Sequence, residues 1–507
     1  MNPVVETSVG RIEGLAETGV QVFRGIPFAA PPVGALRFRA PQAPEPWTGV
    51  REATRFGPPA PQAPSPVMRM LGGHDELRWS EECLTLNVWT PAADRGRRPV
   101  LVWIHGGAFT TGSGGFPIYD GSSLARRGDV VVVTINYRLG ALGFLALPAF
   151  EQEEGNVVGN FGLLDQMRAL EWVRENAESF GGDPGNVTVF GESAGAMSLG
   201  ALLGAPAARG LFRAAILQSG AAHNVSDAEQ GERVAHVFAK ELGVDPSDLR
   251  RLREAPAAAI LEAQVRSVNA LWGQVRGLAF QPVLDGRTLP RPPLDVVREG
   301  GARGVNLLVG TNLEEYKLYR PTDPKVESLD EAALLRRLAR VVPGGEPAAR
   351  RAIETYRLQR EGAAASPTEL WFAIETDRLF RVPALRLADA QAPHAARTFT
   401  YLFTWPSPAL GGKLGSCHAL ELPFVFGTFD LPGLRAFVGD GDEAARLSQR
   451  MQDAWLAFAR SGDPAHRALE RWPAHDPERR PVQIFGRECR VDERGDDPEL
   501  HFWDGIV

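Results

Sequence analysis

The sequence predicts an α/β protein built on one large, mostly parallel sheet with helices on both of its faces. Six short apolar segments have the length and composition of buried strands, and they lie at residues 100–104, 130–135, 187–190, 214–218, 307–310 and 398–403. Residues 162–181 carry apolar side chains at the spacing of an amphipathic helix. Because strands and helices alternate along the chain, the strands are expected to pair in parallel.

Length and composition favour a globular domain with a large core. The chain has 507 residues, of which 44% are hydrophobic and 23% are charged. We expect residues 1–507 to form one domain, because large α/β proteins often keep a single sheet. The segment from about 320 to 395 has charges between its apolar positions and is expected to form a helix-rich cap or regulatory insertion over one end of the sheet. Proline-rich stretches at 58–66 and 343–347 predict surface loops.

Charge and cysteine usage argue against several classes of partner. The formal net charge is −7, which offers no basic surface, so we expect no nucleic-acid partner. Cys83, Cys417 and Cys489 are spaced too widely to predict a disulfide framework or a metal-binding pair. The N-terminal residues lack the basic and apolar segments of a signal peptide, and polar residues interrupt the most apolar window, so we expect a cytoplasmic protein with no membrane span.

One serine stands alone at a predicted strand-to-helix turn. Gly191-Glu192-Ser193-Ala194-Gly195 matches the pattern G-x-S-x-G, with a predicted strand before it and a small-residue helical segment after it. The glycines permit a tight turn and close packing against neighbouring strands. Such a turn presents the hydroxyl at the carboxyl end of the sheet, where open α/β sheets bind ligands. Ser193 is therefore a candidate nucleophile, and the alternative is a serine that only caps the following helix.

A serine nucleophile also needs N–H donors for the negative charge that develops on the substrate carbonyl oxygen. The predicted strand 100–104 is followed by a glycine-rich turn at 105–109 that can aim consecutive amides at an anion. We assign this role to the N–H groups of Gly107 and Ala108, joined by that of Ala194. The alternatives are a flexible glycine loop or a phosphate site, and the sequence contains neither of the two common nucleotide-binding glycine motifs.

A base and an acid are expected after Ser193, in the order serine, acid, histidine. The candidate bases are His394, His418, His466, His475 and His501. His418 stands out because it follows a glycine-rich loop and precedes an apolar segment that can anchor it. The candidate acids are Glu314 and Glu315, which follow the predicted strand 307–310 at the edge of the sheet where Ser193 would emerge.

At these residues the chain resembles the carboxylesterase/cholinesterase family of type-B esterases, which have the α/β-hydrolase fold. The matching stretches cover most of the chain and lie at residues 22–41, 80–91, 103–109, 136–145, 159–198, 217–220, 377–384, 418–427 and 458–464. The resemblance implies that Ser193 is the nucleophile, His418 the general base and acid, and Glu315 the carboxylate that orients the imidazole. Glu315 is preferred over Glu314 because the family spacing G-x-N-x-x-E runs here through Gly310, Asn312 and Glu315.

The resemblance also assigns the supporting residues. The oxyanion hole is formed by the amides of Gly107, Ala108 and Ala194. Glu192 occupies a second acidic position beside the nucleophile, where it favours the protonated histidine. Ser219 matches a position near the triad acid, where structural packing explains it equally well.

Two departures from the family pattern stand out. Cys83 lies where the family has its first disulfide cysteine, but no further cysteine occurs before Cys417, so the usual small disulfide loop is absent and an intracellular location is favoured. Ala108 replaces a glycine of many relatives and still carries the N–H group that an oxyanion needs.

We therefore expect a serine hydrolase that cleaves small-molecule carboxylic esters through an acyl-enzyme, with no cofactor and no metal, as a monomer or weak homo-oligomer. The first alternative is an amidase or carbamate hydrolase with the same triad, and the second is a non-catalytic binding protein of the same fold. Four aromatic residues could line a pocket or fill the core, and for each of them we expect the core: Trp272, Trp371, Phe372 and Trp405.

Overall fold

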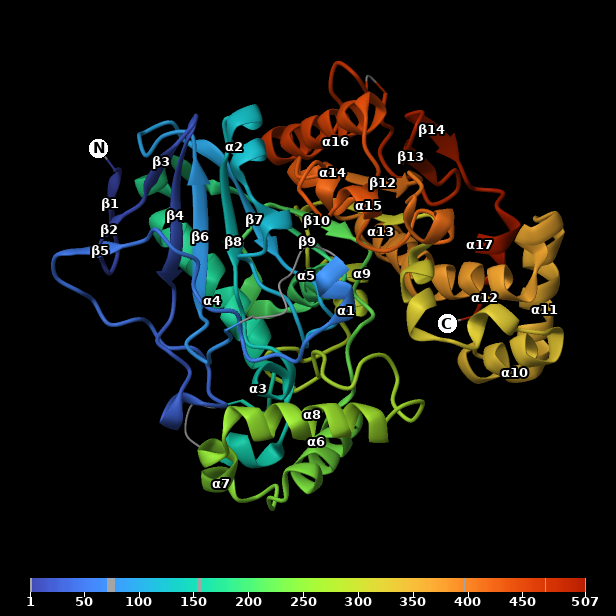
Figure 1. Ribbon diagram of the computed structural model, residues 1–507, viewed down its shortest axis with the longest axis horizontal. Coiled ribbons are helices and arrows are strands. Elements are labelled where there is room, and N and C mark those ends of the chain that lie inside the picture. Colours follow the sequence, from blue (N-terminus) through green and yellow to red (C-terminus); the bar gives the residue numbers. More distant parts are fainter. Residues whose placement is uncertain (1, 71–77, 153–156, 396, 470, 507) are drawn as a thin grey trace.

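The computed structural model describes residues 2–70, 78–152, 157–395, 397–469 and 471–506. Within these residues, eleven strands form one central sheet (Figure 1). From one edge to the other they are β14 (Arg490–Glu493), β13 (Pro481–Phe485), β12 (Thr398–Phe403), β11 (Asn306–Asn312), β10 (Ala214–Gln218), β9 (Gly182–Glu192), β7 (Arg98–Ile104), β8 (Val131–Ile135), β6 (Thr85–Thr90), β4 (Val20–Pro27) and β3 (Leu15–Glu17). The seven neighbours from β13 to β8 run parallel, which confirms the predicted sheet.

A second, three-stranded sheet lies near the N-terminus and contains β1 (Val4–Thr7), β2 (Gly10–Glu13) and β5 (Val50–Glu52). In the central sheet, every residue of β8, β10 and β12 is buried. Burial on both faces explains why these strands are mostly apolar and contain no charged residue, with threonine and glutamine among their few polar residues. β10 and β12 have the predicted bounds, whereas β9 begins earlier than predicted because Gly182 already pairs with Arg98 across a register shift.

Helices pack on both faces of the central sheet. The first face packs against α4 (Phe161–Asn176), α5 (Ala194–Gly204) and α13 (Val382–Gln391), and the second against α2 (Ser122–Gly128), α14 (Leu422–Phe426) and α16 (Asp442–Ser461). Alternate side chains of β7 point to opposite faces of the sheet. Val102 packs in the hydrophobic core on the first face, and Leu101 and Trp103 pack in the core on the second. The predicted helix at 162–181 is present as α4, followed by a 3-10 turn at Ala177–Phe180.

Two further groups of helices lie away from the sheet (Figure 1). The first contains α6 (Ala228–Leu242), α7 (Leu249–Glu254) and α8 (Ala257–Ala270). The second contains α10 (Glu331–Val341), α11 (Gly345–Leu358), α12 (Pro367–Thr376) and the C-terminal α17 (Pro498–Phe502), and it has a hydrophobic cluster of its own. The role of residues 320–395 as a cap stays a prediction. The remaining helices are α1 (Pro66–Met70), α3 (Gly140–Phe144), α9 (Pro293–Arg298) and α15 (Arg435–Val438).

Three local predictions are wrong, wholly or in part. Residues 343–347 are not all loop, because α11 begins at Gly345 and Pro347 stands in its first turn, where a helix needs no N–H donor. Trp272 is not in the core, since it lies in the turn after α8 and is 83% exposed. The third wrong prediction is the surface loop at residues 58–66, because residues 59–62 are buried.

Trp371, Phe372 and Trp405 are buried as predicted, although Phe372 also lines a cavity beside α12. All three cysteines of the chain are free thiols, as the absence of a disulfide framework predicts. In the described parts of the chain, none of the helices combines the length and the apolar character that crossing a membrane requires.

The register of the parallel strands brings the candidate residues to one edge of the sheet. Ile104 of β7 pairs with Gly191 of β9, and Gln218 of β10 pairs both with Glu192 of β9 and with Gly310 of β11. The segments that follow β7, β9, β10 and β11 therefore emerge side by side at the carboxyl ends of the strands.

Candidate active site

Ser193 occupies a sharp turn between β9 and α5. Its backbone has φ 54° and ψ −123°, an uncommon conformation for a residue with a Cβ atom. Two backbone hydrogen bonds hold the turn: Ser193 N–H donates to Gln218 O at 2.9 Å, and Met197 N–H donates to Ser193 O at 2.8 Å. Strain of this kind persists only where the surroundings fix it, and it is concentrated at functional sites.

The two glycines of the G-x-S-x-G pattern pack as the sequence predicts. A Cβ atom on Gly195 would lie 2.0 Å from Ile104 O, and one on Gly191 would lie 2.8 Å from the carbonyl carbon of Gly195. Both contacts are with backbone, which has no room to move away. A larger residue at either position would therefore displace the turn that carries Ser193.

The glycine-rich turn after β7 lies against Ser193. A Cβ atom on Gly106 would be 3.0 Å from Ser193 Cβ, so the two segments are in direct contact. Gly107 has φ 109° and Ala108 has φ 54°, a local backbone that differs from both helix and strand. Within the described part of the chain, the N–H groups of Gly107, Ala108 and Ala194 donate to no protein acceptor. Free amides beside a buried hydroxyl are suited to binding an oxyanion.

Side chains from two other segments hold this turn in place. Tyr137 Oη donates to His105 O at 2.8 Å. Gln62 binds the backbone of Gly112 with both ends of its amide, accepting from Gly112 N–H at 2.8 Å and donating to Gly112 O at 2.9 Å. This pairing explains why residues 59–62 are buried instead of forming the predicted surface loop. Sequence reasoning missed Gln62, because no local pattern distinguishes a glutamine in a proline-rich segment.

The structure brings His418 and Glu315 together. His418 Nδ1 and Glu315 Oε2 are 2.7 Å apart, and His418 N–H donates to Glu315 O at 3.2 Å. Glu315 Oε1 accepts from Asn312 N–H at 2.7 Å, which fixes the carboxylate from the end of β11. Both side chains are buried. A carboxylate in this position selects the tautomer with the proton on Nδ1 and leaves Nε2 as the basic nitrogen.

The other candidates are placed elsewhere. Glu314 pairs with Lys317 at 2.6 Å and accepts from Ser416 N–H at 2.8 Å, so its carboxylate faces away from the imidazole. Three of the remaining histidines have their own partners: His394 with Arg298 O, His475 with Asp389, and His466 with Ala468 N–H. The fourth, His501, lies exposed on α17.

Glu192 contacts the other nitrogen of the imidazole. His418 Nε2 lies 3.0 Å from Glu192 Oε1, and both side chains are buried. Among the described residues no hydrogen bond joins Nε2 to Ser193 Oγ, and such bonds often tighten only in the substrate complex. Burial lowers the pKa of His418, but the charge of Glu192 and the hydrogen bonds to Glu192 and Glu315 outweigh it and raise this pKa well above its usual range. Burial in turn raises the pKa of Glu192.

A third buried glutamate lies behind the first two. Glu421 accepts hydrogen bonds from Asn312 Nδ2 at 2.7 Å and from Gln218 Nε2 at 3.0 Å. Burial, together with the charges of Glu192 and Glu315, raises the pKa of Glu421 to about 8. Sequence reasoning missed Glu421, although a carboxylate three residues after the chosen histidine, inside an apolar segment, was a visible signal.

Ser219 lies at the end of β10 with φ 54°. Its N–H donates to Gly310 O at 2.9 Å, which ties the turn after β10 to the strand that leads to Glu315. In the described residues the Ser219 hydroxyl has no hydrogen-bond partner. Ser219 is therefore linked to the candidate acid Glu315 only indirectly, through the backbone of β11.

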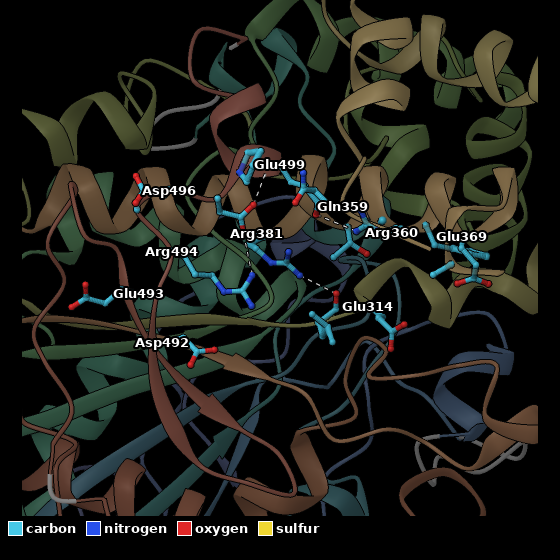
Figure 2. Close-up of a pocket in the computed structure, with 18 of the residues that line it drawn as sticks. Glu314, Gln359, Arg360, Glu369, Arg381, Asp492, Glu493, Arg494, Asp496 and Glu499 are labelled. Atoms are coloured by element: carbon cyan, nitrogen blue, oxygen red, sulfur yellow. Dashed lines mark hydrogen bonds and ion pairs between the residues drawn. The ribbon is translucent and has the colours of Figure 1, made fainter. Parts of the chain in front are cut away.

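The described residues contain no group of three or more His, Cys, Asp or Glu side chains arranged to hold a metal ion. A polar cavity of about 1050 Å³ lies nearby, with walls from α12 and from residues 478–499 (Figure 2). Glu314 and Lys317 contribute to this cavity, so it lies on the far side of the segment that carries Glu315.

The comparisons with known proteins agree with this geometry. Residues 1–503 match the model of the carboxylesterase family. The chain is 42% identical over 499 residues to para-nitrobenzyl esterase of Bacillus subtilis, covering 98% of this chain and 96% of that protein. It is 38% identical to phenmedipham hydrolase of Pseudarthrobacter oxydans, over 96% of this chain and 95% of that one. The solved structure of carboxylesterase EST55 of Geobacillus stearothermophilus is similar with a TM-score of 0.87 at 42% identity, covering 99% of both chains.

Family match, fold and high identity over nearly the whole length lead to one conclusion. The chain belongs to the carboxylesterase family, has the α/β-hydrolase fold and is a carboxylic ester hydrolase.

Proposed function

We propose that Ser193, His418 and Glu315 hydrolyse carboxylic esters in two acyl-transfer steps. In the first step Ser193 Oγ attacks the ester carbonyl carbon while His418 Nε2 takes its proton, and the alcohol then leaves with that proton. In the second step His418 takes a proton from water, the resulting hydroxide equivalent attacks the acyl-enzyme, and Ser193 regains its proton as the carboxylic acid departs.

The strongest support for this proposal is the buried 2.7 Å hydrogen bond between Glu315 and His418 Nδ1. When Nε2 takes the proton of Ser193, the imidazole becomes a cation, and the carboxylate stabilises that cation. For the transfer the Ser193 side chain turns toward Nε2, while Glu315 holds the imidazole through Nδ1. Glu192 then remains beside the new imidazolium and favours it.

The proposed oxyanion hole consists of the N–H groups of Gly107, Ala108 and Ala194. Support comes from the contact of the 105–109 turn with Ser193 and from the lack of other acceptors for these amides among the described residues. Donors that are already oriented stabilise a developing oxyanion without reorganising during the reaction.

We propose small-molecule esters as the substrates. The names of the relatives suggest a first panel: para-nitrobenzyl esters, phenmedipham and fumonisin B1, of which the last comes from a Sphingopyxis macrogoltabida esterase that is 36% identical. A second panel of p-nitrophenyl esters of increasing acyl length would define the acyl preference.

The substitution Ser193→Ala tests the proposal. We expect kcat/KM for p-nitrophenyl acetate to fall by about 10⁴-fold or more, since only binding and oxyanion stabilisation remain. Circular dichroism and thermal unfolding would show that the variant is folded. Turnover close to that of the wild type in a folded variant would overturn the proposal.

A further inference from the structure

The helix that runs from α12 to α13 contains an irregular turn beside the candidate active site. Residues Asp377–Arg381 form a π-helical turn, η9, between Thr376 and Val382. One extra residue in a helical turn changes the direction of the following side chains by about 100°. Such turns are rare and occur frequently at functional sites.

The π-helical turn places an aromatic ring on the proposed catalytic base. The Phe380 ring centroid lies 4.9 Å from that of the His418 imidazole, with 47° between their planes. Tyr319, from the segment after Glu315, lies 6.2 Å from the same imidazole. Phe380 is buried, so its ring is held by its surroundings. An imidazole packed against two aromatic rings has little freedom to rotate.

The next residue of the turn reaches the backbone that carries the proposed acid. Arg381 Nη2 donates to Leu313 O at 2.9 Å, and Leu313 precedes Glu315 by two positions. Figure 2 shows the Arg381 guanidinium pointing toward this backbone beside Glu314. Consecutive residues of one turn thus contact the His418 side chain and the segment that leads to Glu315.

A chain of buried hydrogen bonds fixes the turn itself. Arg381 Nη1 pairs with Asp377 Oδ1 at 2.8 Å, and Asp377 Oδ2 accepts from Tyr356 Oη at 2.5 Å. Trp503 Nε1 then donates to Tyr356 Oη at 2.8 Å, which connects the C-terminal segment to the turn. Arg381 also lines the polar cavity of about 1050 Å³. The Arg381 side chain is only 11% exposed, so these hydrogen bonds lie in a largely buried setting beside the cavity.

We propose that the π-helical turn Asp377–Arg381 is a positioning element for ester hydrolysis: Phe380 fixes the imidazole of His418, and Arg381 fixes the backbone that presents Glu315. This inference rests on the proposed roles of His418 and Glu315. It adds residues that do not touch the reacting atoms but set the geometry of those that do.

Replacing Phe380 tests the first half of the proposal. Phe380→Leu keeps most of the apolar volume without the flat ring, and Phe380→Ala removes both. With p-nitrophenyl acetate we expect kcat to fall roughly 10-fold for the leucine variant and roughly 100-fold for the alanine variant, since small misplacements of catalytic groups have effects of this size. KM should stay close to the wild-type value, because Phe380 acts on the base and not on the substrate.

The matched control is Phe399→Ala, another buried phenylalanine, which packs against Phe458 and Trp472. It should lower the melting temperature to a similar extent but leave kcat unchanged at temperatures where the protein is folded. Two results would overturn the positioning role of Phe380. One is an unchanged kcat in both Phe380 variants, and the other is an effect on KM alone that grows with acyl length, as expected of a pocket wall.

The hydrogen bond from Trp503 to Tyr356, which connects the C-terminal segment to the turn, can be tested with a second pair of variants. Trp503→Phe removes the indole donor to Tyr356, and Trp472→Phe removes a buried indole donor to Thr400 O at 3.2 Å. We expect kcat to fall only in the Trp503 variant. Equal kcat in the two variants would contradict the positioning role of the hydrogen bonds that hold the turn.

His418→Ala distinguishes failure of this inference from failure of the proposed function. If His418→Ala is inactive while both Phe380 variants keep the wild-type kcat, the positioning role is wrong and the proposed mechanism stands. If His418→Ala keeps the wild-type activity, the proposed mechanism is itself wrong, and the positioning inference falls with it.

Discussion

Glu315 and Glu314 are adjacent in the sequence but have different partners in the structure, so they form a matched pair for substitution. Glu315→Gln keeps the size of the side chain and removes a buried charge 2.7 Å from His418 Nδ1. Glu314→Gln removes a partly exposed charge that pairs with Lys317. We expect a large loss of activity in the first variant and almost none in the second.

The expected loss for Glu315→Gln follows from the geometry. An N–O distance of 2.7 Å places the centres of the carboxylate and the imidazolium about 4 Å apart. At an effective dielectric constant of about 20, unit charges at this separation attract by about 4 kcal/mol. Losing this attraction from the transition state would lower kcat by about 10³-fold. An amide also permits the wrong tautomer of the histidine, and the corresponding change in serine proteases costs about 10⁴-fold.

The assay is steady-state hydrolysis of p-nitrophenyl acetate near neutral pH, with thermal unfolding recorded for each variant. We expect kcat to fall by about 10³- to 10⁴-fold in Glu315→Gln. We expect kcat of Glu314→Gln to stay close to the wild-type value, since the Glu314 carboxylate pairs with Lys317 and does not contact the imidazole. The reverse pattern, or equal losses in two folded variants, would refute the assignment of Glu315.

Three further predictions concern charge and backbone strain. Glu192→Gln should shift the acidic limb of the profile of kcat/KM against pH to lower pH. The neutral imidazole is the active form, and the charge of Glu192 raises the pKa of His418. An acidic limb at the wild-type pH would contradict this. Glu421→Gln should have a higher melting temperature than the wild type, and the difference should widen between about pH 5 and pH 8 and stay constant above pH 8. Folding raises the pKa of this carboxyl from 4.5 to about 8, so the wild type loses stability as the pH rises through that window. A difference in melting temperature that does not depend on pH would contradict this. Ala108→Gly should raise the free energy of unfolding by about 1 kcal/mol in denaturant titrations, because Ala108 has φ 54°, a backbone conformation that glycine adopts more easily. The variant should keep its kcat/KM, because the N–H group remains. A large loss of activity would mean that the methyl group matters.

The central sheet was predictable from the sequence because its strands are buried on both faces. β10 and β12 are short, mostly apolar segments without a charged residue, and their observed ends match the predicted ones. The turn at Ser193 was also predictable, because Gly191 and Gly195 are required by contacts with nearby backbone. Local patterns suffice where the physical constraint is itself local.

Long-range contacts could not be predicted in this way. Gln62 holds Gly112 across 50 positions of sequence, and nothing near Gln62 indicates this partner. The same holds for Trp272, whose exposure depends on where α8 ends rather than on the hydrophobicity of the residue. Residues alone also left Glu314 and Glu315 open as candidate acids. Family spacing favoured Glu315, and in the structure the partners of each carboxylate differ.

The π-helical turn is a third case. The segment 377–384 was among the stretches that match the family, but an extra residue in a helical turn leaves no periodic signal in a single sequence. The contact of Phe380 with His418 joins positions 38 residues apart, from an inter-helix turn to a loop. Only the tertiary arrangement of α12, α13 and the loop after β12 brings the two rings together.

Trapping the acyl group on the enzyme tests the proposed acyl transfer to Ser193 most directly. The protein is mixed with a p-nitrophenyl ester, quenched in acid within the first turnovers, digested and analysed by mass spectrometry. The account predicts one acyl group per chain, located on Ser193 and absent from the Ser193→Ala variant. An acyl group on another residue, or the same adduct in Ser193→Ala, would contradict it.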